Sequence, residues 1–274
     1  MTLNEFLTVL TRIVYVLVAI VTLTQWLRTR DRTRLDIALV FVSLGLTIVI
    51  QGAEQIFGRP IQWLENIGTL ALLAHPYFLL RIAHYFRPVP PIVRRAALLG
   101  LAVSWTALIL SGTTPSIPLI LLIVVYFAGV EVYATSIFIR GALTTGGITR
   151  QRLRLASTGS GLLAGIILLA GVLVVLPAEV IPFFTPLTQV FALLAGLGYY
   201  FGFSPPRWLR QAWQLNEFHN YLRETSGQWA QQRSNTFKHL STAAVRVTGG
   251  TTAVIALWDF EEKSLKIDAP GEPP

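Results

Sequence analysis

The arginines of this chain alternate between the two ends of its apolar segments, and this alternation limits the possible folds more than any other feature. Seven apolar stretches follow one another, each roughly 17–25 residues long, which is enough to cross the ~30 Å hydrocarbon core of a bilayer. They lie at 6–26, 35–57, 61–85, 96–112, 118–140, 155–176 and 187–204. Thirteen arginines stand at or after the ends of the odd-numbered stretches: Arg28, Arg30, Arg32, Arg34, Arg87, Arg94, Arg95, Arg140, Arg150, Arg152, Arg154, Arg207 and Arg210. The N-terminal tail and the other connections contain one arginine, Arg59.

Cationic loops close to the ends of membrane spans remain on the cytoplasmic side. The alternation therefore predicts a multi-pass protein of the plasma membrane with its N-terminus outside and its C-terminus in the cytoplasm. The predicted fold class is an all-α membrane protein, with a seven-transmembrane helix bundle over residues 1–206. Charged residues make up 13% of the chain, about half the share of a soluble domain. The net charge of +8 does not indicate a nucleic-acid partner, because the arginines are spread over loops and form no single groove.

The composition changes after Pro205-Pro206, where the chain becomes polar but keeps apolar residues at helical spacing. These residues are Phe218, Leu222, Thr225, Trp229, Thr236, Leu240, Ala243 and Val247. The spacing predicts a cytoplasmic signalling helix over 207–247 whose apolar seam pairs with a second copy in a parallel homodimer. The alternative is an amphipathic helix that lies on its own following domain. Ser226-Gly227 is the point at which such a helix would break.

The last segment, 248–274, has the pattern of strands. Gly249-Gly250 ends the preceding helix, Thr251–Phe260 is rich in β-forming residues, and Ser264–Ile267 begins a second strand after the turn at 261–263. We expect this segment to be the start of an incomplete α/β domain, since two strands alone are marginally stable.

Polar residues cluster at the outer ends of spans two, three and seven. They are Gln51, Glu54 and Gln55 in span two, Gln62, Glu65 and Asn66 in span three, and Gln189 in span seven. Residues spaced by three and four share one face of a helix, so these side chains could form an outward-facing polar cup for a small ligand. The alternative is ordinary solvation of span ends at the membrane interface.

Two ionisable residues lie nearer the middle of the membrane, His75 in span three and Glu131 in span five. Ionisable groups at this depth are costly and commonly functional. Their similar depth predicts that they pair, with Tyr126 and Tyr133 flanking the carboxylate and Pro76 providing a hinge. The pair is either a proton- or cation-sensitive switch or an interhelical hydrogen bond that fixes packing.

Span six carries Ser157, Gly161 and Gly165 at intervals of four residues. Small residues at this spacing allow two helix backbones to approach closely. The contact would lie either inside one bundle or between two copies of the chain.

The sequence contains no recognisable catalytic, cofactor-binding or metal-binding motif. It has no cysteine, and its three lysines all lie beyond the last span. A retinal pigment needs a lysine within the membrane to form its Schiff base, so seven spans do not make this chain a rhodopsin.

Two segments resemble bacterial membrane sensor histidine kinases that have a seven-span input region. The exit from span seven, YYFGFSPPRWLRQAWQ (Tyr199–Gln214), resembles the junction at which such a bundle continues into a cytoplasmic helix. The segment FKHLSTAAVRVTGGTTAVIALWDFEEKSLKI (Phe237–Ile267) resembles the opening of a GAF domain.

The resemblance implies a signal-input module of a two-component-type system, which relays a membrane or small-ligand stimulus to a cytoplasmic output domain missing from this chain. ATP would be required only by the kinase domain of a longer parent protein. An alternative from a different class is a small-solute transporter with a regulatory C-terminal tail.

Overall fold

The computed structural model describes residues 3–57, 62–112, 115–226, 233–248, 253–259 and 264–268. The predicted strand residues and glycines outside these ranges, including Gly249-Gly250 and the turn at 261–263, are not described. The described chain is mostly helical. Its first part contains α1 (Leu3–Thr29), α2 (Arg32–Phe57), α3 (Gln62–Phe86), α4 (Pro91–Ser111), α5 (Ile117–Thr144), α6 (Gly147–Leu173), the short 3-10 helix η1 (Ala178–Val180) and α7 (Ile181–Phe203). Its last part contains α8 (Arg207–Ser226), α9 (Arg233–Thr248), β1 (Ile255–Asp259) and β2 (Ser264–Asp268).

Six of the described helices are long and apolar enough to cross a bilayer: α1, α2, α4, α5, α6 and α7. This composition indicates a multi-pass membrane protein. The third predicted span also forms a helix, and α3 is 25 residues long. It is not among the six, because polar residues such as Glu65, His75 and Arg81 lower its hydropathy. The structure thus supports six membrane spans, and seven remains a prediction.

The chain divides into two compact units, and the division runs through α5 and α6. The bundle unit contains Met1–Gly141 and Arg154–Ser204. The C-terminal unit contains Ala142–Leu153 and Pro205–Pro274. The connection between α5 and α6 therefore belongs to the C-terminal unit, although most of both helices belongs to the bundle.

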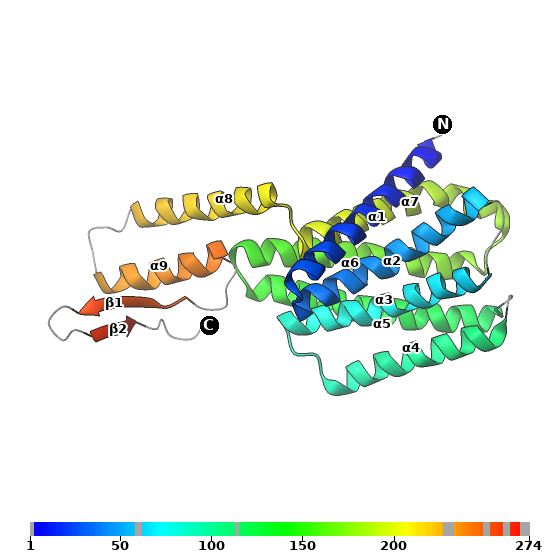
Figure 1. Ribbon diagram of the computed structural model, residues 1–274, viewed down its shortest axis with the longest axis horizontal. Helices are drawn as coiled ribbons and strands as arrows, with labels where there is room; N and C mark the ends of the chain where they lie inside the picture. The colour runs from blue at the N-terminus through cyan, green and yellow to red at the C-terminus, as the bar shows by residue number, and fades with distance from the viewer. Residues whose placement is uncertain are drawn as a thin grey trace. The chain divides into compact units, whose positions relative to one another are not determined.

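The bundle is organised around α2 and α3. Helix α2 packs against α1 and α3, α7 packs against α1, and α4 packs against α3, and the helices run side by side in Figure 1. Helix α3 is lined with buried side chains along half of its length, among them Leu79, Leu80 and Ile82. The end that carries the arginines, where α1, α3, α5 and α7 end, is called the arginine-rich end below.

The closest approach of α6 to α7 uses glycines other than those predicted. A Cβ on Gly159 would lie 2.9 Å from the carbonyl oxygen of Ala195, and a Cβ on Gly198 would lie 3.0 Å from that of Leu155. A Cβ on Gly165 would have no neighbour within 4 Å, so the predicted stripe does not make this contact. The residues of α6 that pack inside the bundle lie on a different face of the helix. Gly159 and Ser160 are on this face and are buried.

The C-terminal unit contains two helices where the sequence suggested one. Helix α8 is described as far as Ser226 and α9 from Arg233 onward, and the two helices pack against each other. The described parts of this segment therefore do not form one straight helix. Strands β1 and β2 pair antiparallel, with Trp258 opposite Leu265, which agrees with the predicted hairpin. Two strands do not distinguish a GAF domain from other folds, so that assignment is not established.

The connection between α5 and α6 lies directly against α9 within the C-terminal unit. Gly147, the first residue of α6, has a φ of 60°, a backbone conformation that glycine adopts without strain. A Cβ on Gly147 would collide with the carbonyl oxygen and Cα of Arg246. Gly147 therefore permits a close backbone contact between the α5–α6 connection and α9.

Candidate functional site

His75 and Glu131 form a pair in the interior of the bundle. The imidazole Nε2 of His75, on α3, lies 3.1 Å from Oε1 of Glu131, on α5, and both side chains are 0% exposed. The pairing expected from their depth in the membrane is thus present. In a water-free interior an ionisable group needs such a partner, because an isolated charge there costs several kcal/mol.

The second ring nitrogen of His75 determines where the proton of this pair can lie. Nδ1 is 3.1 Å from the carbonyl oxygen of Val40 and 3.3 Å from Oγ of Ser43, both on α2. A carbonyl oxygen can only accept, so Nδ1 carries a proton and donates it to Val40. Nε2 then either donates to a carboxylate, as part of an imidazolium, or accepts from a protonated Glu131. Nε2 of His75 and Oε1 of Glu131 therefore lie close enough for one proton to pass between them.

The other carboxylate oxygen of Glu131 accepts two hydroxyl hydrogen bonds. Oγ of Ser160, on α6, donates to Oε2 at 2.7 Å, and the hydroxyl of Tyr199, on α7, donates at 3.1 Å. Ser160 in turn accepts a hydrogen bond of 2.8 Å from Thr135. These donors stabilise a charge on Glu131, whereas the protonated acid would satisfy them less well. His75, Glu131, Ser43, Ser160 and Tyr199 together are called the His75–Glu131 site.

Aromatic rings enclose this site and continue from it along the bundle. The ring of Phe127 stacks on the imidazole of His75 at 6.1 Å, and Tyr199 meets it edge-on at 5.8 Å. Tyr199 then stacks on Phe203, which contacts Phe138. Because both α5 and α7 approach their ends along this row, the aromatic contacts lead from the site toward the arginine-rich end.

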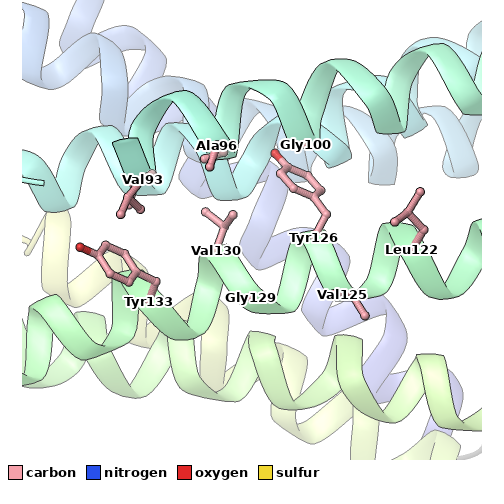
Figure 2. A pocket seen from close by; sticks show the side chains of 11 residues that line it. Val93, Ala96, Gly100, Leu122, Val125, Tyr126, Gly129, Val130 and Tyr133 are labelled. Atoms are coloured by element: carbon pink, nitrogen blue, oxygen red, sulfur yellow. The ribbon is translucent and has the colours of Figure 1, made fainter. Parts of the chain in front are cut away.

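The tyrosines expected beside Glu131 lie elsewhere. Tyr126 donates a hydrogen bond of 3.3 Å to the carbonyl oxygen of Leu73, close to Pro76, whose missing N–H interrupts the helical hydrogen bonds of α3. Tyr133 lies on the side of α5 that faces α4, as Figure 2 shows. Both tyrosines lie close to the level of Glu131 along α5, but they point in other directions. Residues two and five positions from Glu131 lie on a different face of the helix. The tyrosine that contacts Glu131 is Tyr199.

The residues of the predicted outward cup lie at one end of the bundle. The end of α2 and the starts of α3 and α7 lie together there (Figure 1), so Gln51, Glu54, Glu65, Asn66 and Gln189 share a level. Gln51 and Asn66 are exposed, and the other three are partly buried. Asn66 accepts a hydrogen bond of 3.3 Å from Gln62, which is a contact within α3. A ligand cup between the three helices remains a prediction.

A second buried carboxylate was not predicted from the sequence. Asp36, on α2, is 1% exposed and lies 2.7 Å from the guanidinium of Arg81, on α3. Its other oxygen accepts a hydrogen bond of 2.9 Å from the hydroxyl of Tyr85. The sequence did contain a signal for this pair. Asp36 stands at the start of one apolar stretch and Arg81 near the end of the following stretch, so the two lie at the same end of neighbouring antiparallel helices. Among the described residues, no three His, Asp or Glu side chains come together as a metal site requires.

Comparison of the chain with protein-family models, with curated proteins and with solved structures finds no match. Its function must therefore be inferred from the His75–Glu131 site and from the helices that the site connects.

Proposed function

We propose that this chain is the membrane-embedded input module of a bacterial two-component-type sensor, in which the His75–Glu131 site is a proton-dependent switch. The observation that carries the proposal is the 3.1 Å contact between His75 and Glu131, two completely buried ionisable groups that we propose share one proton. Gain or loss of that proton leaves an uncompensated charge in the bundle, and the helices must shift to accommodate it. Similarity to the input regions of sensor histidine kinases, described from the sequence, supports the same class of function.

The proposed topology counts α3 as the third of seven spans, with the N-terminus outside and the C-terminus in the cytoplasm. Helix α3 is 25 residues long and packs against α2 and α4, which are both apolar enough to span a bilayer. Its lower hydropathy follows from polar residues such as Glu65, His75 and Arg81. Seven spans also keep the arginine-rich connections on one side of the membrane.

The groups that surround the switch come from every helix packed around it. His75 is held by α2 through Val40 and Ser43, and Glu131 is held by α6 and α7 through Ser160 and Tyr199. The phenol of Tyr15, on α1, is within electrostatic range of Glu131. Of these groups, His75 and Glu131 are the two that we propose share the proton. A change in their shared proton therefore alters contacts to several helices at once.

The proposed relay passes through α5 and α6. Glu131 and Ser160 lie on these two helices, and the connection between them belongs to the C-terminal unit, where Gly147 contacts Arg246. A movement of about 1–2 Å along packed helices is typical of signal relays. A shift of α5 against α6 at the site would therefore change the contact of their connection with α9.

The proposed output assembly is a homodimer formed through α8. Trp208, Leu215 and Phe218 are 63%, 63% and 52% exposed, and their spacing of seven and three residues is typical of a seam between two parallel helices. A second copy of this chain would cover that seam.

The experiment uses a spin-labelled pair within the C-terminal unit. The chain has no cysteine, so Leu143→Cys and Leu240→Cys, at two exposed positions, introduce unique labelling sites in liposome-reconstituted protein. Distances measured by double electron–electron resonance at about pH 5 and about pH 8, on either side of the histidine range, should differ by about 2 Å or show two populations.

The same distances in two variants test whether the site causes the change. Glu131→Gln removes the shared proton and should give one distribution at both pH values. Asp36→Asn changes the other buried carboxylate of the bundle and should retain the response. Identical distributions at both pH values in the unsubstituted protein, or an unchanged response in Glu131→Gln, would refute the proposal.

A further inference from the structure

A groove of about 410 Å³ runs between α4 and α5, on the side of α5 opposite the His75–Glu131 site. Val93 and Tyr133 lie at one end of it and Leu122 at the other (Figure 2). The volume is within the range of pockets that bind small molecules. From Leu122 to Tyr133 the groove follows about 16 Å of α5, at ~1.5 Å per residue.

Two glycines leave this space open. A Cβ on Gly100, on α4, would lie 2.5 Å from the ring of Tyr126, so the absence of a side chain lets this ring approach α4 closely. A Cβ on Gly129, on α5, would have no neighbour within 4 Å. The groove therefore has the rigid backbone of two helices as its walls and an unfilled position at Gly129.

The surroundings of the groove are apolar and face outward. Leu99 is 66% exposed and Val125 is 69% exposed, and both α4 and α5 are apolar enough to span a bilayer. In the proposed topology the groove opens toward lipid hydrocarbon, and an extended apolar chain fits its lining.

The end of the groove near Val93 is positively charged. Arg94 and Arg95 lie in the first turns of α4 and are exposed, and within the described chain neither guanidinium has a partner. Arg140 follows Tyr133 by seven residues on the same face of α5. The acidic residue of these two helices, Glu131, is completely buried on another face. Arg94 and Arg95 thus offer two exposed guanidinium groups to a negatively charged group at this end.

We propose that this groove binds an anionic phospholipid, with one acyl chain between α4 and α5 and the phosphate at Arg94 and Arg95. Basic pockets between membrane helices recognise anionic headgroups through such arginines, each of which contributes about fivefold in affinity near the surface. The proposal goes beyond the switch function and does not depend on it.

The test compares phosphatidylglycerol with phosphatidylcholine carrying the same acyl chains, added to the purified full chain in detergent. Native mass spectrometry counts the lipid retained per protein. The unsubstituted protein should retain phosphatidylglycerol about tenfold better than phosphatidylcholine. Equal retention of the two lipids would overturn the proposal.

Two variants with matched controls locate the site. Gly129→Leu fills the groove and should lower phosphatidylglycerol retention at least about fivefold, whereas Gly165→Leu, at an equally open position on α6, should not. Arg94→Gln with Arg95→Gln should abolish the preference for phosphatidylglycerol, whereas Arg32→Gln with Arg34→Gln, which removes the same charge from the start of α2, should keep it. Unchanged retention in Gly129→Leu, or equal losses in both arginine pairs, would overturn the proposal. If Gly129→Leu does not fold, the two arginine pairs decide between these outcomes.

Discussion

Oγ of Ser160 donates a hydrogen bond of 2.7 Å to Oε2 of Glu131 and thereby joins α6 to α5 in the middle of the bundle. The same oxygen accepts from Tyr199 on α7, while the opposite oxygen faces His75 on α3. One carboxylate thus connects four helices. Any change in its charge or position alters the packing of α5 against α6, which are the helices whose connection reaches the C-terminal unit.

The first prediction concerns the energetic coupling of His75 and Glu131. His75→Ala leaves Oε1 of Glu131 facing a cavity and should destabilise the protein by about 3 kcal/mol or more. Glu131→Gln keeps the shape and most hydrogen bonds, so its effect should be about 1–2 kcal/mol. A double-mutant cycle, measured by equilibrium unfolding in bicelles, should give a coupling of about 1–3 kcal/mol. Additive effects of the two substitutions would show that the pair does not interact.

The second prediction concerns the close contact of α6 with α7. Gly159→Ala places a methyl group 2.9 Å from the carbonyl oxygen of Ala195, so it should separate the helices and cost about 1–3 kcal/mol. Gly165→Ala, on the same helix with no neighbour within 4 Å, should be neutral or stabilise by up to about 1 kcal/mol. Unfolding of both variants in the same bicelles measures the difference. Equal stabilities would contradict the described packing of α6.

The third prediction is an asymmetry between Asp36 and Arg81. The Arg81 side chain is 40% exposed whereas Asp36 is 1% exposed. Arg81→Ala leaves a buried carboxylate with the hydroxyl of Tyr85 as its support, and should cost about 3 kcal/mol. Asp36→Ala leaves a guanidinium that can turn toward water or headgroups, and should cost less, about 1–2 kcal/mol. The reverse order of the two unfolding free energies would show that Asp36 is not buried.

The fourth prediction concerns the contact of the α5–α6 connection with α9. Gly147→Ala combines a collision with the Arg246 backbone and a positive φ that costs an alanine about 1–2 kcal/mol. Amide exchange in α9 should become about tenfold faster, which corresponds to about 1.4 kcal/mol of local stability. Gly146→Ala is the control, since its Cβ would lie 3.8 Å from the Arg246 side chain, an ordinary contact. Hydrogen–deuterium exchange with mass spectrometry compares the two variants, and equal rates in both would refute the contact.

The sequence was informative about depth in the membrane and much less so about direction around each helix. Depth follows from counting residues along an apolar stretch, and it was sufficient to pair His75 with Glu131. The rotation of each helix depends on packing against its neighbours, which a single sequence does not state. Tyr199 was therefore missed as the partner of Glu131, and Gly159, which lies against α7, was not among the small residues of α6 selected from the sequence.

A second limit of the sequence concerns contacts between helices, as α3, α8 and α9 show. A weak point at Ser226-Gly227 was predicted from local chemistry, since serine followed by glycine weakens a helix. The packing of α9 against α8 could not be predicted in this way, because it requires contacts between residues distant in sequence. Helix α3 has the length of a span, but polar residues such as Glu65, His75 and Arg81 lower the hydropathy by which a span is recognised.

The placement of residues 142–153 in the C-terminal unit has a practical consequence for protein engineering. A chimaera that joins this bundle to a foreign reporter domain at Pro205 would keep the α5–α6 connection but discard α9, the surface on which it rests. Such a fusion should respond poorly even with an intact membrane part. A chimaera that transfers residues 142–153 together with the segment from Pro205 onward keeps both the α5–α6 connection and α9, and therefore keeps their contact.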